Sequence, residues 1–215
     1  MKAYEGKGVW EKSTHQGFWG EIAPCEHVLQ IYEDDQVFMD LLTGFVSGGI
    51  KAGDCVIVIA TAAHLKTLED QLAADGFNTF ELKLKDQFIP MDAHAALAQF
   101  MVNGWPDELL FKHFVTQLIA RAQRKKRKVR TFGEMVAILW AQGLNGATVQ
   151  LEDLWNRFCE TEAFCLFCAY PKSGFTQDAL DSMMHICGAH SKVIAGWGKS
   201  KTELMYQNLT PKKTG

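Results

Sequence analysis

Apolar residues along the chain fall into short runs, and stretches with helical spacing separate these runs. The run from Val56 to Ala60 is β-branched and apolar but too short for a helix, so it predicts a strand buried on both faces of a sheet. Comparable patterns predict strands at residues 27–32, 129–133 and 164–170, a weaker strand at 78–84, and a short edge strand at 191–194.

Between the strands, amphipathic spacing predicts helices that begin at capping residues. The caps are Asp34, Thr61, Asp92 and Asp107, whose side chains can accept hydrogen bonds from the first free N–H groups of a helix. The expected helices cover residues 35–47, 62–75, 92–101, 107–123, 134–142, 147–160 and 176–189. Strands that alternate with helices indicate an α/β fold, with three layers, a mostly parallel sheet, helices on both faces and a Rossmann-type topology.

The two ends of the chain lack such periodicity. We expect residues 1–20 to form a weakly ordered arm, which Trp10, Phe18 and Trp19 would hold against the core. Residues 21–195 would form one domain, and residues 196–215 a tail with a short helix at best.

Composition narrows the class of protein. The chain has 215 residues, 47% of them hydrophobic and 22% charged, which is typical of a globular domain. Its net charge of −3 gives no basic field, so we expect no direct contact with nucleic acid or with a membrane surface. Because no apolar run approaches the length of a membrane span or a signal peptide, we expect a cytoplasmic protein with its six cysteines reduced.

The loop after the strand at 56–60 has nearly the spacing of a phosphate-binding loop. Lys66 and Thr67 match the last two places of G-x-x-x-x-G-K-[ST], but Ala60 and Leu65 stand where glycines are needed. The backbone could not wrap a phosphate there, so we interpret the segment as a degenerate P-loop. A residual nucleotide-binding ATPase remains an alternative function.

Cysteine and histidine spacing offers a second alternative, a metal-binding regulatory protein. Cys168, Cys187 and His190, with His185 nearby, could converge through the fold on one ion. Cys165 cannot share a site with Cys168, because residues three apart on a strand point to opposite faces. We nevertheless expect no metal and no cofactor.

Several segments together resemble one known family. They are HVLQIYEDD (27–35), IVIATAAH (57–64), FGEMVAILW (132–140), LEDLWN (151–156), CAYP (168–171) and ICGAHS (186–191). Their order over residues 21–194 is similar to that of the MEDS family, the DcmR-type sensory domain of methanogen and methylotroph regulators, typified by a dichloromethane-responsive repressor. The resemblance implies a RecA/KaiC-like sensor of small molecules such as hydrocarbon derivatives, and it implies signalling to a histidine kinase or transcription regulator. Neither output module is present in this chain, so we expect that partner in trans, with a homodimer as one form of output.

Ligands of open parallel sheets bind outside the carboxyl ends of the strands. The candidate ligand-binding residues are therefore Tyr32, Glu33, Asp34, Thr61, His64, Phe132, Glu134 and Tyr170. The aromatic residues Tyr32, Phe132 and Tyr170 would form apolar walls, and Glu33, His64 and Glu134 would orient the ligand. Glu134 has a second interpretation, since an anion near a helix N-terminus is stabilising in itself.

We find no catalytic motif in the sequence. No G-x-S-x-G nucleophile elbow is present, and no Ser–His–Asp order suggests itself. We therefore expect a sensory domain that is not an enzyme. An adaptor that acts only through protein contacts is a further alternative.

Overall fold

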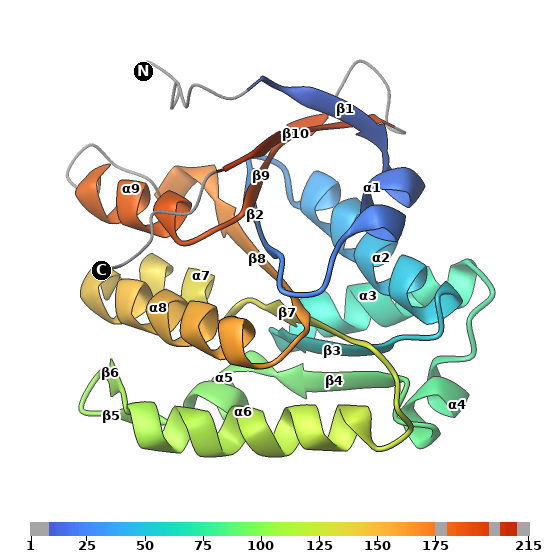
Figure 1. Ribbon diagram of the computed structural model, residues 1–215, viewed down its shortest axis with the longest axis horizontal. Helices are drawn as coiled ribbons and strands as arrows, with labels where there is room; N and C mark the ends of the chain where they lie inside the picture. The colour runs from blue at the N-terminus through green and yellow to red at the C-terminus, as the bar shows by residue number, and fades with distance from the viewer. Residues whose placement is uncertain (1–8, 175–179, 198–202, 210–215) are drawn as a thin grey trace.

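The computed structural model describes residues 9–174, 180–197 and 203–209, and an eight-stranded sheet forms its centre (Figure 1). The sheet strands are β1 (Glu11–Thr14), β2 (His27–Tyr32), β3 (Cys55–Ala60), β4 (Phe88–Asp92), β7 (Val129–Gly133), β8 (Cys165–Pro171), β9 (Lys192–Trp197) and β10 (Glu203–Asn208). They lie in the order β1-β10-β9-β2-β8-β7-β3-β4. The six strands from β9 to β4 are parallel, whereas β10 and β1 pair antiparallel at one edge.

Helices cover both faces of the sheet. They are α1 (His15–Glu21), α2 (Asp35–Lys51), α3 (Ala62–Ala74), α4 (Thr79–Leu84), α5 (Ala93–Leu97), α6 (Glu108–Gln123), α7 (Met135–Ala141), α8 (Asn145–Thr161) and α9 (Leu180–Gly188). A short hairpin of β5 (Met101–Val102) and β6 (Trp105–Pro106) precedes α6. The expected three-layer α/β fold with a mostly parallel sheet is confirmed.

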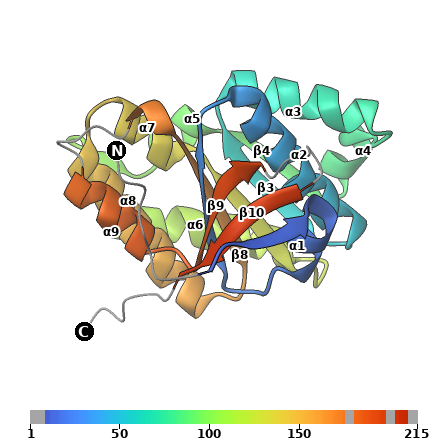
Figure 2. The ribbon, with the colours of Figure 1, turned by 90° about the horizontal axis from the view of Figure 1, so that it is seen from above.

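Strand side chains alternate between two apolar cores. Val58 and Phe167 face the core built with α1, α2 and α3, whereas Ile57 and Leu166 face the core built with α5 to α9. Figure 2 shows α2 and α3 on one side of the sheet, and α8 and α9 on the other. We call these the α2 face and the α8 face.

The segment 78–84, predicted as a strand, is the helix α4, and the strand β4 follows it. The prediction was wrong because apolar residues alternate there without a buried face: Phe80 and Leu84 are both 70% exposed. Instead, the Asn78 side chain accepts a hydrogen bond from the Glu81 N–H, which starts a helical turn.

Both ends of the chain contribute strands that local pattern does not predict. Residues 11–14 form β1 and residues 203–208 form β10, so the expected weakly ordered arm and the expected tail with a short helix at best are wrong for these residues. The expected strand at 191–194 exists as β9, but it lies between β2 and β10 rather than at an edge. The placement of the domain boundaries at residues 20 and 195 remains a prediction.

A buried ion pair holds α1 against the sheet. The Arg130 side chain donates to the Asp54 carboxylate at 2.7 Å and to the Trp19 carbonyl oxygen at 2.7 Å. Phe18 and Trp19 are buried, as expected, whereas Trp10 is 40% exposed.

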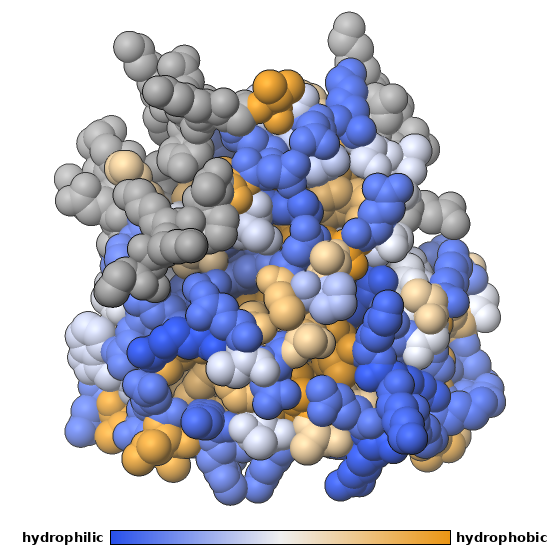
Figure 3. Space-filling view, in the orientation of Figure 1, coloured by the Kyte–Doolittle hydropathy of each residue, from blue (hydrophilic) through white to orange (hydrophobic). Residues whose placement is uncertain are grey.

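Polar and apolar side chains are intermixed on the surface (Figure 3). Among the described residues, no helix is both long and apolar enough to cross a membrane.

Candidate functional site

The carboxyl ends of β3 and β7 meet at a topological switch point. The chain leaves β3 toward β4 on one side and leaves β7 toward β8 on the other, so the loops diverge above adjacent strands. Ligand sites of α/β proteins favour such a position. Thr61, His64 and Glu134 lie there.

Glu134 and His64 form a hydrogen-bonded pair at this point, which we call the edge pair. The Glu134 Oε1 atom lies 2.9 Å from His64 Nδ1, and Oε2 accepts a hydrogen bond of 2.8 Å from the Thr61 N–H. The Glu134 N–H donates to the Ile59 carbonyl oxygen at 2.8 Å. The carboxylate of Glu134 therefore occupies the N-terminus of α3, where a P-loop would hold phosphate.

The hydrogen bond to Glu134 raises the pKa of His64 above its ordinary value near 6.5, although partial burial opposes the shift. The His64 side chain is 24% exposed, and the Glu134 side chain 10%. The edge pair is thus a partly buried hydrogen-bonded contact that solvent reaches through His64.

A cluster of aromatic rings packs beside the edge pair on the α2 face and contacts it through Phe38. Tyr32 stacks on Phe38 with ring centroids 4.7 Å apart, and Phe38 packs edge-on to His64 at 5.1 Å. Phe132 lies 5.7 Å from Phe38. Burial and the Glu134 charge raise the pKa of Tyr32, so its hydroxyl stays neutral.

The remaining predicted residues lie elsewhere or have other contacts. The Asp34 carboxylate accepts hydrogen bonds from the N–H groups at the start of α2, and the exposed Glu33 pairs with Lys172. Tyr170 points into the α8 face, opposite to Tyr32. The structure therefore brings together five of the eight predicted residues: Tyr32, Thr61, His64, Phe132 and Glu134.

The P-loop-like residues Lys66 and Thr67 face solvent rather than a phosphate-binding loop. Lys66 pairs with Asp70 at 2.6 Å, with both side chains exposed, and the Thr67 hydroxyl donates to the Ala63 carbonyl oxygen. Leu65, at the second glycine place, packs against the core of the α2 face.

A second group of ionisable side chains lies inside the α8 face. It consists of His27 on β2, Glu152 on α8, Cys168 on β8 and His190 after α9, and we call it the buried quartet. Each member is at most 2% exposed, and one donor atom from each lies within 4.8 Å of the others.

Contacts within the buried quartet centre on Glu152 Oε2. That atom lies 3.5 Å from His27 Nε2, 3.8 Å from Cys168 Sγ and 3.8 Å from His190 Nε2. The other carboxyl oxygen, Oε1, accepts a 2.5 Å hydrogen bond from the Tyr170 hydroxyl.

Burial makes the buried quartet neutral. It raises the pKa of Glu152 to about 8, lowers the pKa of His190 to about 4, and lowers the pKa of His27 well below its ordinary value. It also raises the pKa of the Cys168 thiol well above its usual range. The contacts between Glu152 and the two imidazoles are therefore not ion pairs near pH 7.

Sequence spacing identified only part of the buried quartet. Cys168 and His190 belong to it, whereas Cys187 does not, and the His185 side chain is 58% exposed beside Asp153. The helical spacing of apolar residues could have revealed that Glu152 is buried, because Glu152 falls on the buried stripe of α8 with Leu151 and Trp155.

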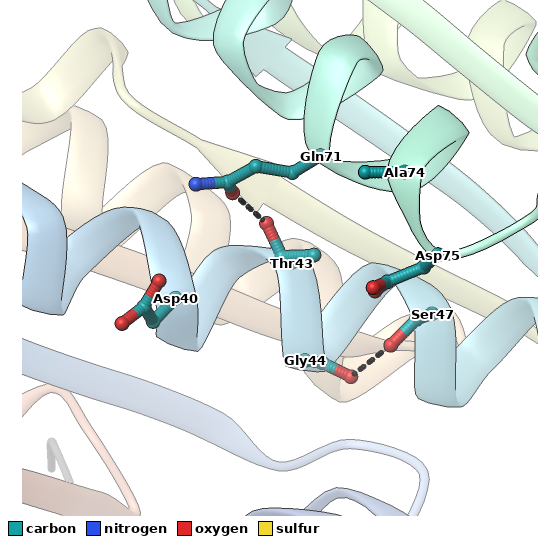
Figure 4. Close-up of a pocket in the computed structure, with 7 residues that line it drawn as sticks. All are labelled: Asp40, Thr43, Gly44, Ser47, Gln71, Ala74 and Asp75. Atoms are coloured by element: carbon teal, nitrogen blue, oxygen red, sulfur yellow. Dashed lines mark hydrogen bonds between the residues drawn. The ribbon is translucent and has the colours of Figure 1, made fainter. Parts of the chain in front are cut away.

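A shallow groove of about 340 Å³ lies between α2 and α3 (Figure 4). A 2.5 Å hydrogen bond joins Thr43 Oγ1 to Gln71 Oε1 across it, and Asp40 and Asp75 lie beside it. The groove contains none of the predicted ligand-binding residues.

Solved structures of three archaeal proteins share the fold at low sequence identity. A KaiC-like protein of Pyrococcus horikoshii has a TM-score of 0.55 and 11% identity, with 86% of this chain and 78% of that chain covered. Another protein of the same organism has a TM-score of 0.54 and 12% identity, with 85% and 87% covered. The flagellar accessory protein FlaH of Methanocaldococcus jannaschii has a TM-score of 0.51 and 11% identity, with 81% and 72% covered. These likenesses establish a RecA/KaiC-like fold.

No curated protein matches the chain in sequence. The model of one family, the methanogen/methylotroph DcmR sensory domain, matches residues 26–186, which include the edge pair and all but one member of the buried quartet. This match spans well over half of the chain and confirms the resemblance of the sequence motifs. The chain belongs to the MEDS family of sensory domains.

Proposed function

We propose that the chain is a non-catalytic sensory domain whose small-molecule ligand binds at the edge pair. The observation that carries the proposal is the Glu134 carboxylate, which bonds to the Thr61 N–H at the start of α3. A phosphate at this helix terminus would meet an anion already in place, which disfavours a nucleoside triphosphate.

The surroundings of the edge pair favour a small, mainly apolar ligand with one polar group. Tyr32, Phe38 and Phe132 supply apolar walls, and His64 and Glu134 supply two hydrogen-bonding groups. His64 is the more exposed partner, so a ligand would reach Glu134 by displacing its imidazole.

Glu134 is also placed to transmit a change. Its side chain contacts the start of α3, and its own residue immediately precedes α7. A ligand that moves the carboxylate would shift the contacts of both helices. We propose that a histidine kinase or transcription regulator in trans, or a second copy of the chain, responds to this shift.

A thermal-shift screen tests the proposal with short alcohols, carboxylic acids and halocarbons. A ligand that binds only the native state raises the melting temperature. We expect at least one compound to do so, and we expect Glu134→Gln to abolish the shift. Glu69→Gln is the matched control, because Glu69 lies on α3 but pairs with Lys83. A panel without any hit, or a shift unchanged by Glu134→Gln, would reject binding at the edge pair.

One observation favours an alternative function, an adaptor that acts only through protein contacts. The chain's own side chains fill the edge, because His64 packs on Phe38 while it bonds to Glu134. An adaptor would show no ligand shift in the screen. It would instead bind a purified partner protein, and His64→Ala would leave that binding unchanged.

A further inference from the structure

We propose that the buried quartet binds one divalent transition-metal ion, with Zn²⁺ as the best match, in a closed four-coordinate site. Two imidazoles, one thiolate and one carboxylate are ligands that zinc prefers. The site lies on the α8 face, whereas the edge pair lies on the α2 face, so the inference is independent of the proposed ligand site.

Distances within the buried quartet suit a tetrahedral ion. Bonds of about 2.0–2.3 Å in a tetrahedron separate neighbouring ligand atoms by roughly 3.3–3.8 Å. His27 Nε2 lies 3.3 Å from Cys168 Sγ and 3.5 Å from Glu152 Oε2. Glu152 Oε2 lies 3.8 Å from both Cys168 Sγ and His190 Nε2, and all four donor atoms lie within 4.8 Å of one another. An ion could enter with small side-chain shifts.

Hydrogen bonds from outside the buried quartet already orient two of its members, His190 and Glu152. His190 Nδ1 lies 2.6 Å from the Ile186 carbonyl oxygen, and because a carbonyl only accepts, this nitrogen carries the proton. The lone pair of His190 is therefore on Nε2, which is buried and has no hydrogen-bond partner within the described chain. Outer contacts of this kind set the tautomer of metal-binding histidines.

Tyr170 orients the carboxylate in the same way. Its hydroxyl bonds to Glu152 Oε1, which leaves Oε2 directed at the two imidazoles and the thiol. This contact also gives Tyr170, predicted as a wall of the ligand site, a position in the outer shell of the proposed metal site.

The charges of the proposed complex cancel. Cys168 as thiolate and Glu152 as carboxylate offset the 2+ charge of the ion, and the two imidazoles bind as neutral ligands. Two protons leave the protein when the metal enters. A neutral complex is suited to an interior where all four ligands are at most 2% exposed.

The proposed ion would join segments that are distant in the sequence. Its ligands come from β2, α8, β8 and the segment after α9, so the metal would tie two parallel strands to the helices that cover them. Because the ion binds only the folded arrangement, its removal should lower the melting temperature.

Metal analysis of the full-length chain tests the proposal directly. We expect about one equivalent of zinc per chain, and a chelator should lower the melting temperature as it removes the zinc. X-ray absorption at the zinc edge should show one sulfur and three nitrogen or oxygen ligands. A chain that retains no metal, even after refolding with Zn²⁺, or a first shell with two sulfurs or none, would overturn the assignment.

Matched variants identify the ligands in the cobalt-substituted protein. Thiolate-bound, four-coordinate Co²⁺ gives a charge-transfer band and intense visible bands. We expect Cys168→Ala to remove the charge-transfer band, whereas Cys187→Ala, a control at another buried thiol, retains it. We expect His190→Ala to weaken metal retention at least tenfold, and His185→Ala to leave it unchanged. Loss of the band in Cys187→Ala alone would contradict the buried quartet, and the absorption measurement on the unmodified chain decides the matter if a variant does not fold.

Discussion

The edge pair and the buried quartet use the same chemical groups in opposite states. Both place a glutamate against histidine, but the His64 pKa is raised by its bond to Glu134, whereas burial lowers the His190 pKa to about 4. A partly solvated carboxylate stabilises a charged imidazole, and a dry one becomes neutral together with its neighbours. Residue type therefore does not determine charge in this protein; depth does.

The surroundings of the two glutamates explain the difference. Glu134 accepts a hydrogen bond from a backbone N–H at the start of α3, and its partner His64 reaches solvent. Glu152 contacts two buried imidazoles, a thiol and a tyrosine hydroxyl, and burial raises its pKa to about 8. This difference agrees with our two proposals, a ligand from outside at the edge pair and an ion inside the buried quartet.

The largest expected effect is the loss of the buried carboxyl. Glu152→Ala, measured by urea unfolding with a chelator present, should lower the free energy of unfolding by about 2–4 kcal/mol, because it leaves a cavity and removes the acceptor of the Tyr170 hydroxyl. The matched control is Asp153→Ala, at a side chain 46% exposed, which should change the free energy by less than about 0.5 kcal/mol. Equal effects from the two variants would remove the distinction between a buried and an exposed carboxyl on α8.

A smaller effect is expected at the edge pair, whose contribution to the stability of the fold should depend on pH. The folded pKa of His64 is raised, so the pair stabilises the fold fully below about pH 6.5, and this stability is lost as pH rises through the folded pKa. We expect a loss of less than about 1 kcal/mol, since solvent screens the contact. Thermal unfolding of the wild type and His64→Gln over this range should show the slope only in the wild type. A slope of the same size in both proteins would mean that another group titrates.

The smallest effect concerns the P-loop-like residues. Lys66→Ala should leave the melting temperature unchanged, because Lys66 and Asp70 are both exposed. It should also leave ATP turnover unchanged, at the background rate of a sample without protein. Turnover in the wild type that Lys66→Ala abolishes would favour the ATPase over the sensory domain.

The sequence predicted the parts of the fold that local pattern determines. The buried runs of β2, β3, β7 and β8 were placed correctly, and Asp34 and Thr61 cap the helices that were expected to follow them. Parallel topology then implied that His64 and Glu134 lie at one edge. Their hydrogen bond could not be foreseen, because it depends on how the two loops pack.

The parts that were missed depend on contacts between distant segments. β1 and β10 pair with each other across almost the whole chain, and no local period encodes that pairing. Likewise, His27 joins Cys168 and His190 only because β2 lies between β8 and β9. Tyr170 was grouped with Tyr32 and Phe132 as a wall of one site, but it packs in the core of the opposite face of the sheet. The alternation along β8, in which Phe167 packs on the α2 face, carried that information.

Histidine titration by nuclear magnetic resonance tests the contrast between the two centres most directly. In the metal-free chain, we expect His64 to titrate above pH 6.5 and Glu134→Gln to move its midpoint down. We expect His190 to stay neutral until about pH 4, with Nδ1 protonated. A His190 that titrates near pH 6.5, or a His64 midpoint below that value, would contradict the account.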